Sequence, residues 1–301
     1  MIIATHRRYF FALTALIVAV AIAAVAVYGL KFGIEFTGGT YVKVAFDGAR
    51  PGAEEITERL RTSGLADFSA RAAGEHEYDI RIAGAHAEDQ GLISKAVTTW
   101  GAFPGSVVET SHIGPSIGAE LRAKSILAVA LVLLCILVFV AFAFRKVSRP
   151  VSSWIYGLIA LITLVHDVIV PVGFYAVLGH VWGAEIDTLF VTAVLTVLGF
   201  SVHDTIVVFD RVRENLRTNQ ERNRKEPFAE TAGYALSQTL VRSVNTSLTV
   251  VITLAVLFFV GPASTQHFAL TLLVGIIAGT YSSIFLATPL LIEAAARTTK
   301  A

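Results

Sequence analysis

The sequence predicts an α-helical integral membrane protein, with six transmembrane helices and a small α+β domain inserted after the first helix. Of the 301 residues, 54% are hydrophobic and only 16% are charged, a balance too apolar for an ordinary soluble domain. Six stretches reach the roughly 20 apolar residues that a bilayer core of about 30 Å requires. A long polar stretch, 31–120, alternates strand-like and helix-like patterns.

The predicted spans divide the chain into an N-terminal unit (1–30), the polar domain (31–120), a five-helix region (121–292) and a tail (293–301). The first apolar run is longer than the roughly 7–15 residues of a signal-peptide core, so we expect it to be retained as a span. The six spans are expected at 9–30, 121–144, 151–178, 188–209, 241–260 and 267–292.

Basic residues in the short loops predict the orientation. Six lie between spans four and five and three between spans two and three, whereas 179–187 and 261–266 contain no Lys or Arg. The positive-inside rule then places both termini in the cytoplasm and the polar domain outside it. Because the basic residues are not gathered in one patch, no nucleic acid partner is indicated.

The polar domain is expected to fold in the order β-α-β-β-α-β, the ferredoxin-like pattern. Residues 41–46 alternate as a half-buried strand does, and 52–61 place Ile56 and Leu60 on one helical face. The other elements are expected at 68–72, 78–82, 87–100 and 107–113. No catalytic or metal-binding cluster stands out in this part of the sequence.

The segment Phe36-Thr37-Gly38-Gly39 joins the first span to this domain. Two consecutive glycines suit a tight turn where the backbone approaches another segment closely. A simple turn without a further role explains the pattern equally well.

The fourth span contains Asp204. A charged side chain at the bilayer centre costs about 2.5 to 3.5 kcal/mol on insertion scales, so such residues usually have a function. Small and hydroxylated residues in the same span favour close contact with another helix, which would direct Asp204 into the bundle. These residues are Thr188, Thr192 and Thr196, and the stripe leads through Gly199 to His203.

The fifth span offers Asp204 a basic partner, Arg242. Asp204 lies seven residues before Arg211, about 10 Å from the cytoplasmic end, and Arg242 enters from the same side. A nearby cation favours the charged carboxylate, whereas burial favours the neutral acid, and both together suit a proton carrier. A permanently protonated or permanently paired carboxyl is the structural alternative. Arg242 continues into a polar stripe of Asn245, Thr249 and Thr253.

The third span contains His166 and Asp167, followed by Pro171. Asp167 is a candidate second proton site. Alternatively, it hydrogen-bonds a backbone group that the proline leaves free, since proline cannot donate within a helix.

Two further features concern packing. Gly275 and Gly279 in the sixth span are four residues apart, which predicts a tight helix crossing. The segment 211–240 has an apolar stripe and is expected to lie along the cytoplasmic membrane surface. The stripe consists of Phe228, Ala232, Ala235, Leu236 and Leu240.

Several of these motifs together resemble the SecF family, a part of the SecDF membrane component. They are Phe36 to Gly39, His166-Asp167, the long run 194–215 around Asp204, and the entry to span five at 238–243. The family is similar in architecture to one half of an RND-superfamily transporter. One departure is His203, because the residue before the span-four aspartate is usually Asn in the family.

The resemblance implies a function in protein export across the cell's inner (cytoplasmic) membrane. A SecF-like chain pairs obligatorily with SecD, works beside the SecYEG channel, and uses the proton gradient to help move an unfolded preprotein outward. Asp204 and Arg242 match the proton-transfer residues, with His203 and Asp167 as further candidates. Motion would reach the polar domain through residues 36–39, and no cofactor or metal is implied.

Two other classes stay open on the sequence. An intramembrane aspartyl protease would use Asp167 and Asp204 as a pair sharing a proton, although the Gly-x-Gly-Asp context of such enzymes is absent. A small-solute or metal transporter would use His166 and His203 beside these aspartates, although neighbouring residues on a helix point about 100° apart and chelate poorly. We expect a non-enzymatic, proton-driven subunit.

Overall fold

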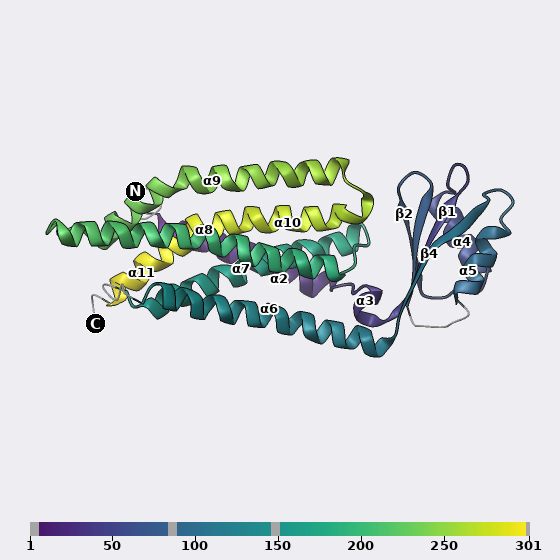
Figure 1. Cartoon of the computed structure of the whole chain (residues 1–301), viewed down its shortest axis with the longest axis horizontal. Coiled ribbons are helices and arrows are strands. Elements are labelled where there is room, and N and C mark those ends of the chain that lie inside the picture. The colour runs from purple at the N-terminus through teal and green to yellow at the C-terminus, as the bar shows by residue number, and fades with distance from the viewer. Residues whose placement is uncertain (1–5, 84–88, 146–150, 299–301) are drawn as a thin grey trace.

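The molecule is elongated, with a helical bundle at one end and a small sheet domain at the other (Figure 1). The computed structural model describes residues 6–83, 89–145 and 151–298. The start of the first described helix and the end of the last one both lie at the end of the bundle that is far from the sheet domain (Figure 1). This agrees with six spans, because an even number of crossings returns the chain to its starting side.

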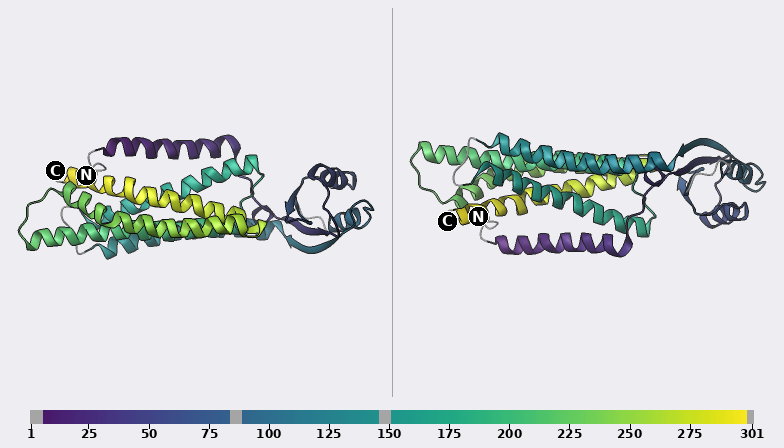
Figure 2. Two further views of the ribbon diagram at one scale, coloured as in Figure 1. Left: turned by 90° about the horizontal axis from the view of Figure 1, so that it is seen from above. Right: turned by 90° about the horizontal axis from the view of Figure 1, so that it is seen from below.

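Six helices of the described chain are long and apolar enough to cross a membrane, as predicted. The first, α2 (Arg7–Tyr28), runs along one edge of the bundle (Figure 2). It packs closely on α7, where a Cβ at Gly173 would lie 2.5 Å from Ala21 Cα. The others are α6 (Pro115–Ala143), α7 (Ser153–Val181), α8 (Thr188–Glu221), α9 (Phe228–Val260), and a last span formed by α10 (Ala263–Ser282), η1 (Ser283–Ala287) and α11 (Thr288–Thr298).

The last span changes its hydrogen-bonding pattern in the middle, where η1 is π-helical. Pro289, just after η1, has no N–H to donate to the carbonyl of Phe285 four residues earlier. A π-helical turn is a common way for a long helix to accommodate such a missing bond, and these turns often occur at functional sites. Here the turn follows Ser282 directly, which places this serine at the irregularity.

The segment 211–240 differs from its prediction as a surface helix. Helix α8 continues to Glu221, and α9 begins at Phe228 and runs unbroken into the membrane-spanning part. The apolar stripe packs on the bundle instead, since Ala232 and Ala235 belong to a buried cluster of the bundle. Gln238 Oε1, in the same segment, also accepts hydrogen bonds from the side chains of Arg211 and Asn215 in α8. The stripe is amphipathic as expected, but protein covers it.

The polar domain has the predicted ferredoxin-like order. Its elements are β1 (Gly39–Phe46), α4 (Ala53–Thr62), β2 (Phe68–Ala73), β3 (Glu77–Ala83), α5 (Asp89–Thr98) and β4 (Gly105–Ile113). The four strands are antiparallel in the order β2-β3-β1-β4. Alternate residues of β1, such as Val42 and Val44, form one buried core with Ile56 of α4 and Ile93 of α5.

Two neighbouring strands connect this domain to the bundle. Strand β1 follows the short helix α3 (Ile34–Thr37), and β4 leads through Gly114 into α6. The strands pair where they meet the bundle, Gly39 with Ile113. Helix α6 starts earlier than predicted, because Pro115 occupies its first turn, where a missing N–H costs nothing.

Candidate functional site

Asp204 lies midway along α8 and is only 3% exposed, so it points into the bundle as predicted. Its Oδ2 is 3.5 Å from Ser247 Oγ of α9, the long limit of a hydrogen bond. Ser247 Oγ also accepts a hydrogen bond of 2.6 Å from Thr280 Oγ1 of α10. Three helices therefore meet at this carboxyl group through hydroxyl side chains.

The threonine stripe of α8 does not lie on the face of the helix that packs against the other helices of this chain. Thr192, Thr196 and His203 are exposed, and so is Gly199. No atom lies within 4 Å of a Cβ built on Gly199, so its prediction as a packing glycine is wrong for this chain. The physical reason is the helical period: His203 and Asp204 point about 100° apart, and in this chain the neighbouring helices cover the face of Asp204 but not that of His203.

Arg242 is exposed on α9, and no ion pair joins it to Asp204 in the described part of the chain. The predicted stripe of Asn245, Thr249 and Thr253 is exposed with it. Helix α9 instead turns the serines Ser243 and Ser247 towards the bundle.

The glycines of the sixth span behave as predicted. A Cβ on Gly279 would lie 2.8 Å from Ser201 Cβ of α8, and one on Gly275 would overlap Val197 of the same helix. Because both positions lack a side chain, α10 approaches α8 closely at the level of the buried polar groups.

Asp167 of α7 is completely buried and has more hydrogen-bond partners than Asp204. Its Oδ1 is 2.7 Å from His166 Nδ1, and its Oδ2 accepts hydrogen bonds from Ser282 Oγ of α10, at 2.8 Å, and from Ser201 Oγ of α8. Asp167 therefore joins α7, α8 and α10. The predicted role for it as a backbone partner near Pro171 is not the contact observed here, because side-chain donors surround it.

Polar groups continue from Asp167 to α2. The ring of His166 lies 6.0 Å, between centroids, from that of Tyr281 in α10. Tyr281 Oη is 3.0 Å from Thr14 Oγ1, and Thr14 is buried in α2. His166 Nε2 is buried without a hydrogen-bond partner among the described residues.

The serines of this site had a sequence signal that we did not use. Ser201 is one helical turn before Asp204 and therefore shares its face. Ser282 lies one turn from Gly279, on the surface that crosses α8. Serine is so common at transmembrane helix contacts that its identity alone does not distinguish a partner of a carboxyl group.

The Phe36 to Gly39 turn is a close contact with α6, as its glycines predicted. Gly38 and Gly39 both have positive φ angles, +79° and +151°. A Cβ on Gly38 would lie 2.8 Å from Pro115 Cα, and one on Gly118 would lie 2.7 Å from Gly38 N. Thr37 Oγ1 donates to Gly33 O at 3.1 Å, and Phe36 is buried against the bundle.

A second contact between domain and bundle was not predicted. Glu185, in the loop between α7 and α8, accepts hydrogen bonds from Arg71 Nη2 of β2 and Arg81 Nη1 of β3, each at 2.9 Å. We call these three residues the Glu185 clasp. Burial raises the pKa of the Glu185 carboxyl, but the two guanidinium groups outweigh burial, so that its pKa lies below the ordinary value.

Backbone bonds support the clasp from the other side. Gly33 N donates to Ile186 O at 2.8 Å, and Ile186 N donates to Lys31 O at 2.7 Å. The loop after α7 is thereby fixed to the segment that leaves α2.

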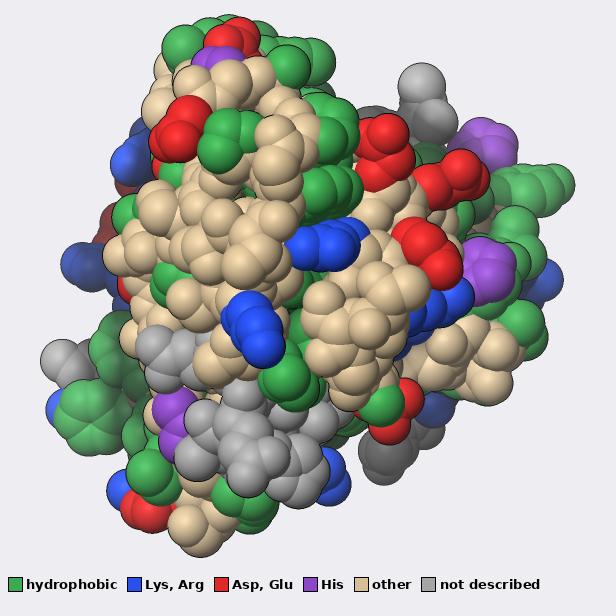
Figure 3. Space-filling model, turned by 90° about the vertical axis from the view of Figure 1, so that its right-hand side faces the viewer, with side chains coloured by type: hydrophobic (Ala, Val, Ile, Leu, Met, Phe, Trp, Pro, Cys, Tyr) green, Lys and Arg blue, Asp and Glu red, His purple; other side chains and the backbone are tan. Residues whose placement is uncertain are grey.

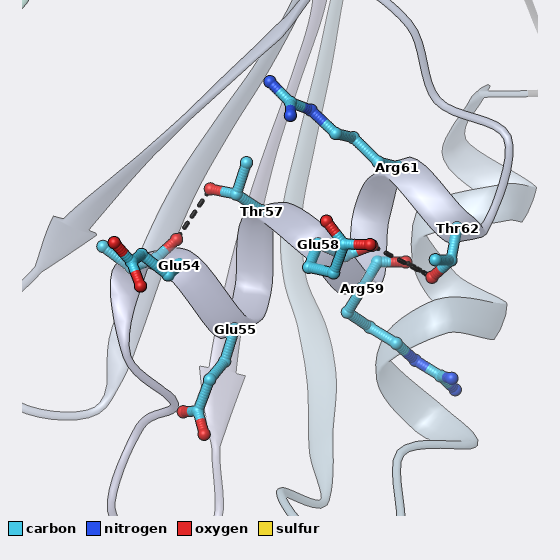
Figure 4. Close-up of a pocket in the computed structure, with 8 residues that line it drawn as sticks. Glu54, Glu55, Thr57, Glu58, Arg59, Arg61 and Thr62 are labelled. Carbon is cyan, nitrogen blue, oxygen red and sulfur yellow. Dashed lines mark hydrogen bonds between the residues drawn. The ribbon is translucent and has the colours of Figure 1, made fainter.

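The outer surface of the sheet domain offers no comparable site. A hollow of about 860 Å³ runs along α4, but the charged side chains that line it point away from one another (Figure 4). Arg59 turns back to α5, where its Nε donates to Ala96 O at 3.1 Å. Acidic and basic side chains are interspersed on the far end of the domain (Figure 3).

The described residues do not favour the two competing classes. Within them, no group of three or more His, Cys, Asp and Glu side chains could hold a metal ion. Asp167 and Asp204 have separate hydrogen-bond partners, and the described contacts include no hydrogen bond between the two carboxyls.

The fold and the site define a class of protein: a six-span membrane protein with buried carboxyl groups at its helix crossings and an extramembrane ferredoxin-like domain attached to two spans. Comparison with known families then gives two matches. The SecD/SecF GG motif matches residues 23–49, and the C-terminal part of the protein export membrane proteins SecD and SecF matches residues 94–297. The chain belongs to the SecD/SecF family, so the resemblance seen in the sequence is confirmed.

Relatives support this over nearly the whole length. The chain is 43% identical to the protein translocase subunit SecF of Thermobaculum terrenum, over 95% of this chain and 92% of that protein. It is 37% identical to SecF of Desulfurispirillum indicum, over 95% and 89%. These relatives are translocase subunits rather than enzymes.

A longer relative contains this chain as one part. SecDF of Thermus thermophilus is 33% identical over 95% of this chain, which spans 37% of that protein. The crystal structure described as SecDF, a translocon-associated membrane protein, matches with a TM-score of 0.82 and 31% identity, over 96% of this chain and 38% of the other.

Proposed function

We propose that this chain is the SecF subunit of a proton-driven protein translocase, and that Asp204 gains and loses a proton during its working cycle. The observation that carries the proposal is a carboxyl group that is almost fully buried at the meeting point of three helices, with only hydroxyl partners. Hydroxyl groups can accept from the protonated acid or donate to the carboxylate. The site can therefore hold either form.

Asp167 is the second member of the proton pathway. Ser201, which donates to Asp167, lies one turn from Asp204 on α8. Thr280 and Ser282, which belong to the two carboxyl sites, lie two residues apart on α10. Movement of α10 against α8 would therefore change both sites together.

Buried hydroxyl groups beside Asp204 point to water in the pathway. Thr205 Oγ1 and Ser243 Oγ are buried and lack a hydrogen-bond partner among the described residues. An unpaired buried hydroxyl costs about 1–3 kcal/mol, so water that bridges these groups would be stabilising. Such water would also carry the proton between Asp204 and the membrane surface.

The proposed partner is a SecD chain. SecDF of Thermus thermophilus is about 2.7 times as long as the part that this chain matches, and its name joins SecD to SecF. The exposed polar stripes of α8 and α9 are unfavourable against lipid, and a partner helix would cover them. Arg242 and His203 lie on these stripes, so their proposed part in proton transfer belongs to the assembled pair.

The same mechanism supplies enough free energy to move the sheet domain. One proton that crosses about 100 mV releases about 2.3 kcal/mol, which is comparable to conformational couplings of about 1–3 kcal/mol. We propose that the Phe36 to Gly39 turn and the Glu185 clasp pass helix movement to the domain. With the termini in the cytoplasm, this domain meets the preprotein that emerges from SecYEG on the outer side of the inner membrane, and no cofactor is needed.

The test is the Asp204→Asn variant, reconstituted with SecD and SecYEG in proteoliposomes. We expect the proton gradient no longer to stimulate preprotein export, because the amide cannot exchange a proton in this range. Asp210→Asn is the matched control, since Asp210 lies on the same helix but is exposed and paired with Arg213. Undiminished stimulation in Asp204→Asn would refute the proposal.

A further inference from the structure

An apolar cavity lies between the helices on the side of the bundle that faces the sheet domain. Its volume is about 420 Å³, and it is lined by α6, α7, α8 and the segment before β1. The walls are aliphatic and aromatic, including Val129, Val168, Phe190 and Val194. The cavity is open to the side of the bundle, since Ile126 and Ala130 in its wall are exposed, so a ligand can enter it from outside.

One charged residue lines this cavity. Arg122 of α6 is exposed, and its guanidinium carbon lies 5.3 Å from the centre of the Phe32 ring. No carboxylate pairs with Arg122 in the described part of the chain. By contrast, Lys124 two residues later is neutralised by Glu120 at 2.6 Å. The rim of the cavity therefore carries one positive charge that no described side chain balances.

We propose that this cavity binds an acyl chain of an anionic phospholipid from the outer leaflet, with the lipid phosphate held by Arg122. The placement in the outer leaflet rests on the orientation proposed above, but not on proton transfer. Apolar cavities do not take up water readily, and the hydrocarbon available beside these helices is the lipid chain. Basic groups between transmembrane helices are a recognised way to bind anionic headgroups, and Arg binds phosphate through a two-pronged contact.

The bound chain would touch both connections between bundle and domain. Phe36 of the glycine turn and Ile186 next to Glu185 line the same cavity. A filled cavity supports these two side chains, whereas an unfilled one allows them to collapse inward. Lipid occupancy thereby adjusts how firmly the sheet domain is attached.

The experiment is native mass spectrometry of the purified complex with SecD, titrated in detergent with phosphatidylglycerol or phosphatidylcholine. We expect one phosphatidylglycerol to be retained more tightly than phosphatidylcholine. Arg122→Gln should weaken phosphatidylglycerol binding about fivefold, the effect of one basic residue near an anionic lipid, and leave phosphatidylcholine unchanged. Lys124→Gln, the neighbouring paired cation, should change neither.

A second variant blocks the hydrocarbon part of the site. Ala130 lines the cavity and is exposed, so Ala130→Trp can fill the space without disturbing a buried core. This variant should fold with an unchanged melting temperature and lose the retained lipid. The proposal is overturned if the wild type retains no lipid or prefers neither lipid, if the two charge variants behave alike, or if Ala130→Trp keeps its lipid. Retention by the isolated chain but not by the complex would likewise overturn it, since SecD would then fill the cavity.

Discussion

At the scale of single residues, the two buried aspartates differ in how completely they are hydrogen-bonded. Asp167 is surrounded by donors from three helices, whereas Asp204 has one long contact. We predict that Asp167→Asn lowers the free energy of unfolding by about 1–3 kcal/mol, because the amide cannot accept hydrogen bonds on both sides. Asp204→Asn should leave it nearly unchanged. Melting temperatures in detergent measure the difference, and an equal loss in both variants would contradict this contrast.

Glu35 provides a pH-dependent prediction outside the membrane spans. Burial raises the pKa of this carboxyl, although Arg81 opposes the effect, and Glu35 Oε2 has no hydrogen-bond partner among the described residues. A raised pKa means that the folded state prefers the protonated acid, so stability falls as the pH rises through the pKa of the folded state. Glu35→Gln should therefore be at least as stable as the wild type at pH 8, and its advantage should shrink towards pH 4.

The control for Glu35 is Glu58→Gln, which changes an exposed glutamate of α4 in the same domain. Its melting temperature should follow the wild type across the range. If Glu35→Gln also follows the wild type, the unpaired carboxyl has no influence on stability.

At the scale of elements, the crossing of α8 and α10 depends on glycine at two positions. Gly279→Val would push its side chain into Ser201 and should cost about 1–3 kcal/mol through overpacking. Gly199→Ala is the matched change on the exposed face of α8, where open space and better helix propensity predict a gain of up to about 1 kcal/mol. Denaturant titration of the isolated chain gives the free energy of unfolding of each variant for comparison with the wild type. Similar losses would mean that both faces of α8 are packed.

The elements themselves were predictable, because each leaves a local signal. Apolar length predicted the spans, and the alternation around Val42 and Val44 predicted the central strand. Local patterns do not say which neighbour covers a helix face. In α8, polar residues occur on two faces, and the sequence alone cannot tell that Ser201 and Asp204 face this chain while Thr196 and His203 do not. Bundle, partner and lipid all present similar surfaces to such a helix.

At the scale of the whole molecule, the Glu185 clasp was not predictable because it joins residues more than 100 positions apart. Arg81 and Glu185 are 104 residues apart in the sequence, and neither stands out in its own segment. The sequence marked the loop that contains Glu185 only as one without basic residues. The contact exists because the sheet folds so that β2 and β3 face the end of α7.

The clasp predicts a measurable coupling between domain and bundle. A double-mutant cycle of Glu185→Gln and Arg81→Gln should give about 1–3 kcal/mol, since both side chains are largely buried. The lowered pKa of Glu185 means that this stability is present above the ordinary carboxyl pKa of 4.5 and is lost only as the pH falls through the lower value. The coupling should therefore be constant from pH 6 to 8.

A longer and more exposed pair in the same domain serves as the control. Lys43 and Glu77 are 3.9 Å apart on neighbouring strands and should couple by less than about 1 kcal/mol. If the coupling energy between Glu185 and Arg81 is no larger than that between Lys43 and Glu77, the clasp does not hold the domain.

The way in which β1 and β4 enter the bundle has a geometrical consequence. These strands are neighbours and reach the bundle side by side, so both covalent connections of the domain lie at the same half of the sheet. The Glu185 clasp holds the opposite half through β2 and β3. Because the sheet is attached to the bundle only through β1 and β4 once the Glu185 clasp opens, it can then rotate only about that attachment. The strand order thus limits any movement of the domain relative to the bundle to rotation about the line where β1 and β4 meet the bundle.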